Sequence, residues 1–224
     1  MKILLVAATR AEIAPFADRV LDPQHPDQIK LNHHELDILI TGVGMVATAY
    51  ALGRQLSLNT YDLAINAGIA GSFDFDIALG EVVQISEDIF ADLGAEDGDD
   101  FISLKQLGFG EINQFAHTQL QKEEAIRTDD YTFKSLDHIK NVKAITVNKV
   151  HGHEFSIAKT LSRVNAQVES MEGAAFFYAC NQSSTPCLQI RSISNYVERR
   201  NKEKWNLPLA IENLNDFLYR MLAT

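Results

Sequence analysis

The sequence predicts an α/β fold, a single domain of three layers in which a mixed, mostly parallel central sheet lies between helices. Apolar runs of strand length alternate with helix-length amphipathic segments along the chain. Several of these runs are continuous Ile, Leu and Val, which is typical of strands buried on both faces. With 224 residues, the chain is long enough to bury one substantial core.

The individual elements follow from periodicity and from the turn residues that bound each run. Strands are predicted at residues 2–8, 28–32, 35–41, 61–66, 81–86, 144–147, 166–169 and 187–194. Helices, with apolar residues every three or four positions, are predicted at 11–20, 45–58, 154–164, 173–182 and 209–221. His33 and His34 lie between two strands and predict a hairpin turn.

Residues 91–137 depart from this rhythm and predict an irregular flap within the single domain of residues 1–224. They open with an acidic, glycine-rich stretch and then carry the aromatic residues Phe101, Phe109 and Phe115. Loops of this length inside a domain are usually functional or disordered, and the aromatic content favours a folded flap. A role as a lid or partner contact and a role as simple decoration both stay open.

Charge and composition exclude some classes of partner. The net charge of −10 argues against a nucleic-acid or anionic-membrane surface, since both require clustered Lys and Arg. No stretch approaches the roughly 20 apolar residues that span a bilayer, and the apolar start of the chain ends at Thr9, too early for a signal peptide. Cys180 and Cys187 lie in apolar surroundings, which predicts buried free thiols and a cytoplasmic protein.

Polar residues gather at the predicted ends of two strands. Glu172 joins a short strand to a helix, while Arg191 lies in an apolar strand and Asn195 lies just past its end. Polar groups at the carboxyl ends of strands in an open α/β sheet converge on one crevice, where ligands bind. The sequence therefore predicts a small-molecule site at this edge. Glu12, in the first turn of a helix, either compensates the helix dipole or adds a general base to that site.

Two glycine-rich segments and one histidine pair also follow strands. Residues 42–47 fit G-x-G-x-x-A, a pattern typical of a dinucleotide-binding turn and equally of close helix–sheet packing. Residues 66–72 by themselves predict a tight turn, but their position at a strand end also favours a segment whose backbone groups face a ligand. His151 and His153 have no second ligand cluster beside them, so no metal is predicted. The remaining histidines, at positions 25, 33, 34, 117 and 138, are predicted to be solvated.

Taken together, these segments resemble the purine nucleoside phosphorylase and nucleosidase superfamily. The resemblance runs nearly end to end, through Glu12 and residues 42–44, 66–71, 152–155, 168–172 and 191–195. Within the superfamily, residues 171–175 and 194–201 are most similar to the futalosine hydrolases of menaquinone biosynthesis. The methylthioadenosine/S-adenosylhomocysteine (MTA/SAH) nucleosidases share the plan but typically carry Asp where this chain has Asn195.

The resemblance implies a reaction and the residues that catalyse it. It implies hydrolysis of the N-glycosidic bond of futalosine, with release of hypoxanthine and without a cofactor. Glu12 would position the attacking water, helped by Arg191. Nucleosidases often carry a Ser near this water where the present chain has Ile69. The resemblance further implies a homo-oligomer, with a dimer favoured, in which the long central loop helps to cover a neighbouring site.

The same resemblance implies how the nucleoside is bound. Glu172 would bind the ribose 2′- and 3′-hydroxyls, with Met171 beneath the sugar, and Phe155 would flank the base. Asn195 would read the edge of the base and contribute to catalysis at the leaving group. Gly71 and its neighbour Ala70 would face the substrate with backbone groups, which completes the predicted substrate contacts.

The chemistry of residue 195 and of the nearby charged residues bears on which substrate and which reaction are expected. An amide at position 195 can donate to one atom of a 6-oxopurine and accept from another, whereas a carboxylate favours a 6-aminopurine. A mismatched hydrogen-bonding edge costs on the order of 10⁴ in specificity. Phosphorolysis stays open because Arg10 and Arg191 could contact phosphate, although Glu12 would repel it. A noncatalytic NAD- or nucleoside-binding module that uses residues 42–47 is the alternative of a different class.

Overall fold

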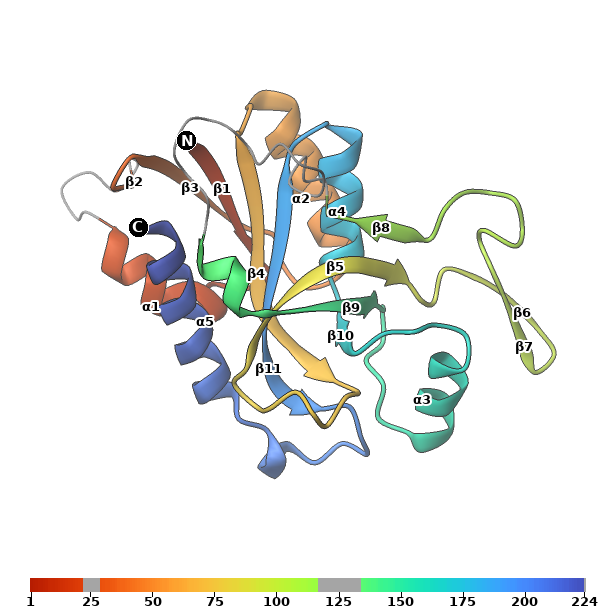
Figure 1. Ribbon diagram of the computed structural model, residues 1–224. Helices are drawn as coiled ribbons and strands as arrows, with labels where there is room; N and C mark the ends of the chain where they lie inside the picture. Colours follow the sequence, from red (N-terminus) through yellow and green to blue (C-terminus); the bar gives the residue numbers. More distant parts are fainter. Residues whose placement is uncertain (22–28, 117–133, 224) are drawn as a thin grey trace.

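The computed structural model describes residues 1–21, 29–116 and 134–223 and confirms the α/β class (Figure 1). The strands of the main sheet are β1 (Lys2–Ala7), β2 (Ile29–Leu31), β3 (His34–Ile40), β4 (Leu63–Ser72), β5 (Val82–Phe90), β8 (Asn113–Phe115), β9 (Lys140–Thr146), β10 (Val168–Ser170) and β11 (Cys187–Tyr196). In the described residues their order is β10-β9-β5-β11-β4-β1-β3-β2, with β8 beside β5. The pairs β1–β3, β1–β4, β4–β11, β5–β9 and β9–β10 are parallel, so the sheet is mixed and mostly parallel.

Helices cover both faces of this sheet, as the apolar runs predict (Figure 1). They are α1 (Arg10–Val20), α2 (Met45–Leu58), α3 (Glu154–Leu161), α4 (Gly173–Gln182) and α5 (Leu207–Leu222). Alternate side chains of β1 divide between two cores. Ile3 and Leu5 pack with residues of α1 and α5, whereas Leu4 and Val6 pack with residues of α2 and α4. Within the described residues, no helix is both long and apolar enough to cross a bilayer.

One end of the sheet closes on itself. β10 pairs with β9 and also, antiparallel, with β4, so β4, β10, β9, β5 and β11 pair in a ring. The register places Glu169 of β10 and Asn195 of β11 on either side of Gly71 of β4. Residues that are distant in sequence therefore meet in one row across three strands.

The predicted turn at residues 66–72 is wrong, because β4 continues through this segment to Ser72. Glycine and alanine there serve close approach between neighbouring strands rather than a reversal of the chain. A Cβ atom on Gly68 would lie 2.3 Å from Nη1 of Arg191, and one on Gly71 would lie 3.2 Å from Nδ2 of Asn195. The small residues of β4 thus leave room for two polar side chains of β11.

Residues 91–116 form a projecting hairpin, β6 (Gly94–Asp97) and β7 (Asp100–Ser103), followed by β8, which returns to the sheet (Figure 1). The predicted flap at 117–133 lies outside the described residues. Two short 3₁₀ helices, η2 (Lys134–His138) and η3 (Lys202–Lys204), complete the description.

The predictions for the histidines are mixed. A turn at residues 32–33 joins β2 to β3, which confirms the hairpin. His34, however, begins β3 and is buried, so its prediction as a solvated residue is wrong; burial lowers its pKa. His33 and His138 are exposed, as expected. Positions 25 and 117 lie outside the described residues.

Candidate active site

Glu12 is fixed in place by backbone and side-chain donors. It lies in the first turn of α1 and is 8% exposed. Its Oε2 accepts hydrogen bonds from the backbone N–H and the hydroxyl of Thr9, both at 2.9 Å. Its Oε1 accepts from the backbone N–H of Ile69 in β4 at 3.1 Å. Glu12 therefore does more than compensate a helix dipole, because its carboxylate bridges α1 and the central strand.

Arg191 lies beside Glu12 at Gly68 and also approaches Glu172. A Cβ atom on Gly68 would lie 2.3 Å from Arg191 Nη1 and 2.8 Å from Glu12 Oε1, so both side chains flank this one glycine. Arg191 Nη1 also lies 3.9 Å from Glu172 Oε2. All three side chains are buried, and Nη2 of Arg191 has no hydrogen-bond partner in the described part of the chain. The structure thus brings together three residues that the sequence separates by about 180 positions.

The glycine turn before α2 holds Glu172. Gly42 and Gly44 have φ angles of +87° and +97°, which favour glycine. The backbone N–H of Gly44 donates to Glu172 Oε1 at 3.0 Å. The N–H group that a dinucleotide-binding turn would offer to a phosphate is therefore bonded to a carboxylate of the chain itself. Met171 is half-buried beside Glu172, at the junction of β10 and α4.

Asn195 lies on a β-bulge near the end of β11. Its Oδ1 accepts from the Ser194 hydroxyl at 2.9 Å, and its Nδ2 donates to the Tyr196 carbonyl at 3.0 Å. Ser194 also donates to the Ala70 carbonyl at 3.2 Å. These contacts orient the amide beside Gly71, so the predicted residues Gly71, Ala70 and Asn195 come together.

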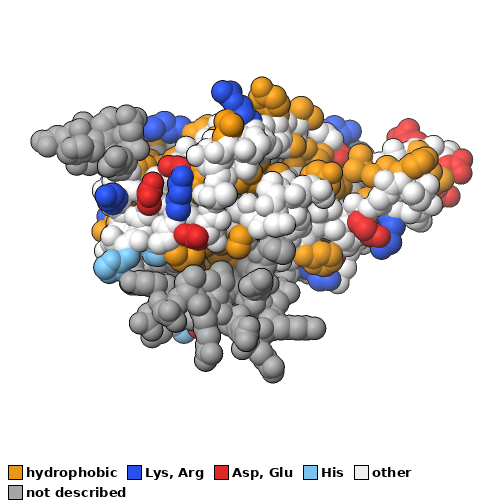
Figure 2. Space-filling model, turned by 90° about the horizontal axis from the view of Figure 1, so that it is seen from above, with side chains coloured by type: hydrophobic (Ala, Val, Ile, Leu, Met, Phe, Trp, Pro, Cys, Tyr) orange, Lys and Arg blue, Asp and Glu red, His pale blue; other side chains and the backbone are white. Residues whose placement is uncertain are grey.

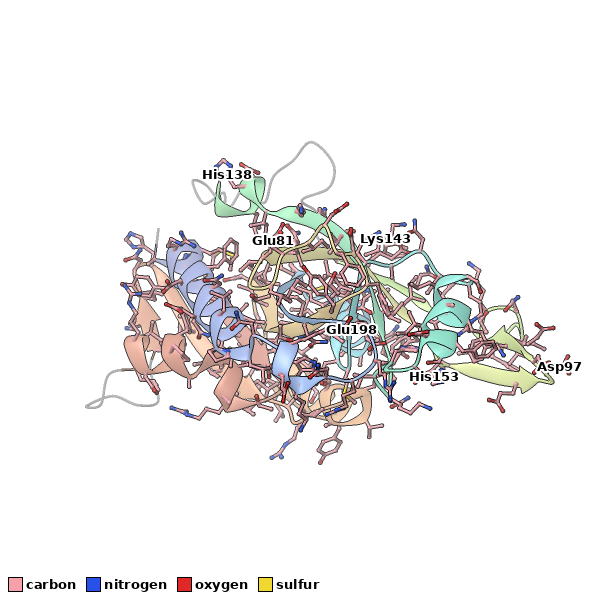
Figure 3. All side chains as sticks on the ribbon, turned by 90° about the horizontal axis from the view of Figure 1, so that it is seen from below. Glu81, Asp97, His138, Lys143, His153 and Glu198 are labelled. Atoms are coloured by element: carbon pink, nitrogen blue, oxygen red, sulfur yellow. The ribbon has the colours of Figure 1, made fainter. Side chains whose placement is uncertain are left out.

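A cavity of about 80 Å³ opens beside Asn195. Its walls are Gly71, Val150, His151, Glu169, Asn195, Tyr196, Val197, Glu198, Arg200 and Trp205. Lys204 of η3 donates to Oε1 of Glu198 at 2.9 Å, and Figure 3 shows His153 at the start of α3 and Asp97 at the far tip of the β6–β7 hairpin. Phe155 does not line this cavity, and its side chain on α3 is 71% exposed. The structure therefore groups Asn195 with Gly71 but leaves Phe155 apart from them.

The cavity contains a hydrogen-bonded histidine–carboxylate contact that the sequence did not indicate. Glu169 is buried and accepts from the backbone N–H of His151 at 2.8 Å, while its other oxygen contacts Nδ1 of the same histidine. Nε2 of His151 lies 2.9 Å from the Thr160 hydroxyl. The sequence pattern around His151 bears only on metal binding and does not indicate this contact with Glu169. Among the described residues, no group of three or more His, Cys, Asp and Glu side chains is arranged to hold a metal ion.

Comparison with known proteins identifies the fold family. The family model described as "Phosphorylase superfamily" matches residues 2–223. The chain belongs to this superfamily. Proteins named futalosine hydrolase from Thermus thermophilus and Streptomyces coelicolor are 29% and 31% identical, over 83% and 80% of this chain and 80% and 75% of their own lengths. The resemblance inferred from the sequence is confirmed.

Solved structures of the superfamily agree with the fold. The MTA/SAH nucleosidase from Colwellia psychrerythraea, solved in complex with adenine, is 25% identical with a TM-score of 0.78 and covers 99% of this chain and 94% of its own. The futalosine hydrolase of Helicobacter pylori has a TM-score of 0.80 at 18% identity, covering 99% of this chain and 97% of its own.

Three polar residues near the site of this superfamily member were missed by sequence reasoning. They are Asp88, Thr146 and Gln189, which form a buried hydrogen-bonded group next to Arg191. A signal was available for Gln189, which interrupts an apolar strand where a polar side chain must find a partner. Asp88, by contrast, lies beyond the strand predicted at 81–86 and follows the polar residues Ser86 and Glu87. Burial raises the pKa of Asp88 to about 6, and the bonds from Thr146 and Gln189 act in the opposite direction.

Proposed function

We propose that this protein hydrolyses the N-glycosidic bond of futalosine, releasing hypoxanthine and dehypoxanthine futalosine in menaquinone biosynthesis. The observation that carries the proposal is that Arg191 lies beside Glu12 at Gly68 and its Nη1 lies 3.9 Å from Oε2 of Glu172. Gly71 and the cavity of Asn195 lie three residues further along the same strand, a distance of about 10 Å. Sugar-binding and base-reading groups thus follow each other along β4. The relatives named futalosine hydrolase support this substrate.

Glu172 stabilises the sugar during bond cleavage. The reaction passes through an oxocarbenium-like ribose, as in glycoside hydrolysis. Hydrogen bonds from the 2′- and 3′-hydroxyls to this carboxylate become stronger as positive charge develops on the ribose. The bond from Gly44 N–H to Oε1 fixes this carboxylate in position before the substrate arrives. Met171 adjoins it beneath the sugar.

Glu12 and Arg191 position the attacking water. The water oxygen forms the new bond to the anomeric carbon and gives a proton to the Glu12 carboxylate, while hypoxanthine leaves with the electrons of the broken C–N bond and takes up a proton from solvent. Thr9 and Ile69 hold the Glu12 carboxylate in one orientation, which is what a water-positioning base requires. The free Nη2 donor of Arg191 is available to orient the water oxygen.

Asn195 reads the base, with Gly71 and Ala70 alongside, whereas the exposed side chain of Phe155 lies outside the cavity and is given no contact with the base. Its amide matches the carbonyl and imidazole nitrogen of a 6-oxopurine. MTA/SAH nucleosidase activity is the second candidate, because the Colwellia psychrerythraea nucleosidase aligns with the whole of this chain. That activity acts on 6-aminopurine nucleosides, so the two candidates differ at the edge that Asn195 faces.

A substrate panel tests the proposal. Futalosine, inosine and methylthioadenosine are incubated with the protein, with and without phosphate, and the free base is measured by chromatography. Phosphate-independent release of hypoxanthine from futalosine is expected. Strict dependence on phosphate would make the protein a phosphorylase, and preferred cleavage of methylthioadenosine would contradict the role given to Asn195.

Asn195→Asp is expected to shift the preference toward 6-aminopurines. The carboxylate would face the lone pairs of O6, so the ratio of kcat/KM for 6-oxo over 6-amino nucleosides should fall by a factor on the order of 10² or more. Asn165→Asp makes the same change at an exposed position outside the cavity and should leave the ratio unchanged. An unchanged ratio in Asn195→Asp would remove Asn195 from base recognition.

The protein acts as a cytoplasmic homodimer in this proposal. Its two cysteines are free and buried, which suits a reducing compartment. Val46 and Tyr50 of α2 are 81% and 73% exposed, close in sequence to the turn that holds Glu172. Figure 2 shows hydrophobic side chains gathered on the upper face of the molecule, over α2. Such a patch is typical of an interface.

Tyr50→Glu is expected to weaken this dimer. A charge placed within an apolar interface loses its hydration without gaining a partner. Sedimentation velocity should show a dimer for the unchanged protein and a shift toward monomer for the variant. The exposed Leu58→Glu change, two turns further along α2, controls for a general effect of an added charge. A monomeric unchanged protein would contradict the proposal.

A further inference from the structure

A buried chain of polar side chains adjoins Arg191 and has no part in the proposed reaction. Asp88 of β5 is fully buried and accepts hydrogen bonds from the Thr146 hydroxyl at 2.7 Å and from Nε2 of Gln189 at 3.0 Å. Oε1 of Gln189 in turn accepts from Nε of Arg191 at 3.0 Å. Asp88 is thus linked to the guanidinium through one intervening amide.

We propose that Asp88 is a positioning residue that acts through Gln189 to fix the guanidinium of Arg191 between Glu12 and Glu172. The consequence for catalysis rests on the proposed function. An ionised carboxylate only accepts hydrogen bonds, so Gln189 must turn its NH₂ group toward Asp88. Its carbonyl is then left for Arg191, which donates from Nε. Asp88 therefore sets the direction of the whole chain of bonds.

Packing at the start of α4 leaves this arrangement little freedom. A Cβ atom on Gly173 would lie 2.0 Å from Oδ2 of Asp88 and 2.1 Å from Oε1 of Gln189, so the helix backbone presses directly on the pair. The Thr146 hydroxyl also accepts from the backbone N–H of Ala174 at 2.8 Å. Gly173 directly follows Glu172 in the chain. The buried side chains of Asp88, Thr146 and Gln189 therefore pack against the start of α4, next to the carboxylate that is proposed to bind the sugar.

The charge of Asp88 depends on pH in the range where enzymes are assayed. Arg191 and Glu172 are the charged groups that act on it, and Thr146 and Gln189 are its hydrogen-bond donors. Desolvation by burial raises its pKa to about 6, so the carboxylate is ionised at pH 7.5 and gains a proton below pH 6. A protonated Asp88 is a weaker acceptor, and kcat is expected to fall as the pH is lowered through about 6.

Asp88→Asn tests the inference, because the amide has the same shape as the carboxylate and one acceptor fewer. At pH 7.5 we expect kcat for the nucleoside to fall about 10- to 100-fold, the range for a lost hydrogen bond to a charged group, with KM little changed. The fall of kcat through pH 6 should disappear. Glu87→Gln alters the neighbouring carboxylate, which pairs with Lys143 and Asn113 away from this group, and should leave kcat unchanged.

Stability separates positioning from a structural role. A carboxyl group whose folded pKa lies above its unfolded pKa makes the folded state lose stability as the pH rises from about 4 to 6. Asparagine does not titrate, so the Asp88→Asn variant does not lose stability over this pH range. Its melting temperature at pH 7.5 should therefore equal or exceed that of the unchanged protein, while its kcat is lower. A lower melting temperature together with the lower kcat would overturn the inference and indicate a structural role.

A double-mutant cycle and a crystal structure complete the test. In a Gln189→Leu background, Asp88→Asn should cause no further fall in kcat, since the link to Arg191 is already broken. An equal fall in both backgrounds would overturn the inference. A crystal structure of Asp88→Asn should show the guanidinium of Arg191 displaced. This readout needs no substrate, so it distinguishes a failure of the inference from a failure of the proposed function.

Discussion

Glu12→Gln should lower kcat by a factor on the order of 10³ while the nucleoside still binds. The carboxylate accepts hydrogen bonds from the backbone N–H groups of Thr9 and Ile69, and these groups can only donate. The NH₂ group of glutamine would face one of these donors, and the variant would also lack the charge that activates water. Turnover should be measured by release of base and affinity by titration calorimetry.

A matched variant makes the result specific. Glu212→Gln removes one carboxylate from an exposed position on α5 and should leave both turnover and affinity unchanged. Full activity in Glu12→Gln would show that another group holds the water. The noncatalytic alternative makes the opposite prediction, because a binding module would be indifferent to Glu12 and would cleave no bond in either form.

Gly68→Ala is expected to cost on the order of 100-fold in kcat, because a shift of about 1 Å in a catalytic group has that effect. The new methyl group would lie 2.3 Å from Arg191 Nη1 and 2.8 Å from Glu12 Oε1, so both side chains must move. Arg191 is buried and bonded to Gln189, which limits where it can go. Overpacking should also lower the free energy of unfolding by about 1–3 kcal/mol.

Gly53→Ala is the control for this change. Gly53 lies in an exposed part of α2, and a Cβ atom there meets nothing within 4 Å. Alanine is the better helix former, so the free energy of unfolding should rise by about 0.5–1 kcal/mol without an effect on kcat. Urea denaturation and steady-state kinetics on both variants measure the two effects. Unchanged kinetics in Gly68→Ala would mean that Arg191 and Glu12 need not stay where they are.

Much of the fold could be predicted because its signals are local. Continuous apolar runs and three-to-four-residue periodicity located β1, α2, α4 and α5 to within two residues at each end. Failures came where the local signal had a tertiary cause. The glycines of residues 66–72 favour a turn by themselves, but Arg191 and Asn195 pack against them across the sheet. His34 is polar, yet it is buried at the start of β3, where it pairs with Leu31 of β2.

The sequence by itself determined the α/β class, the superfamily and the residue types at the strand ends, including Glu12, Glu172 and Asn195. Only the tertiary structure decided which of these meet. Pairing of β10 with both β9 and β4 closes the ring and sets Glu169 opposite Gly71. The physical reason is that sequence periodicity reflects interactions between residues close together in the chain. Contacts between strands that are distant in sequence form only when those strands pair, so no local pattern specifies them.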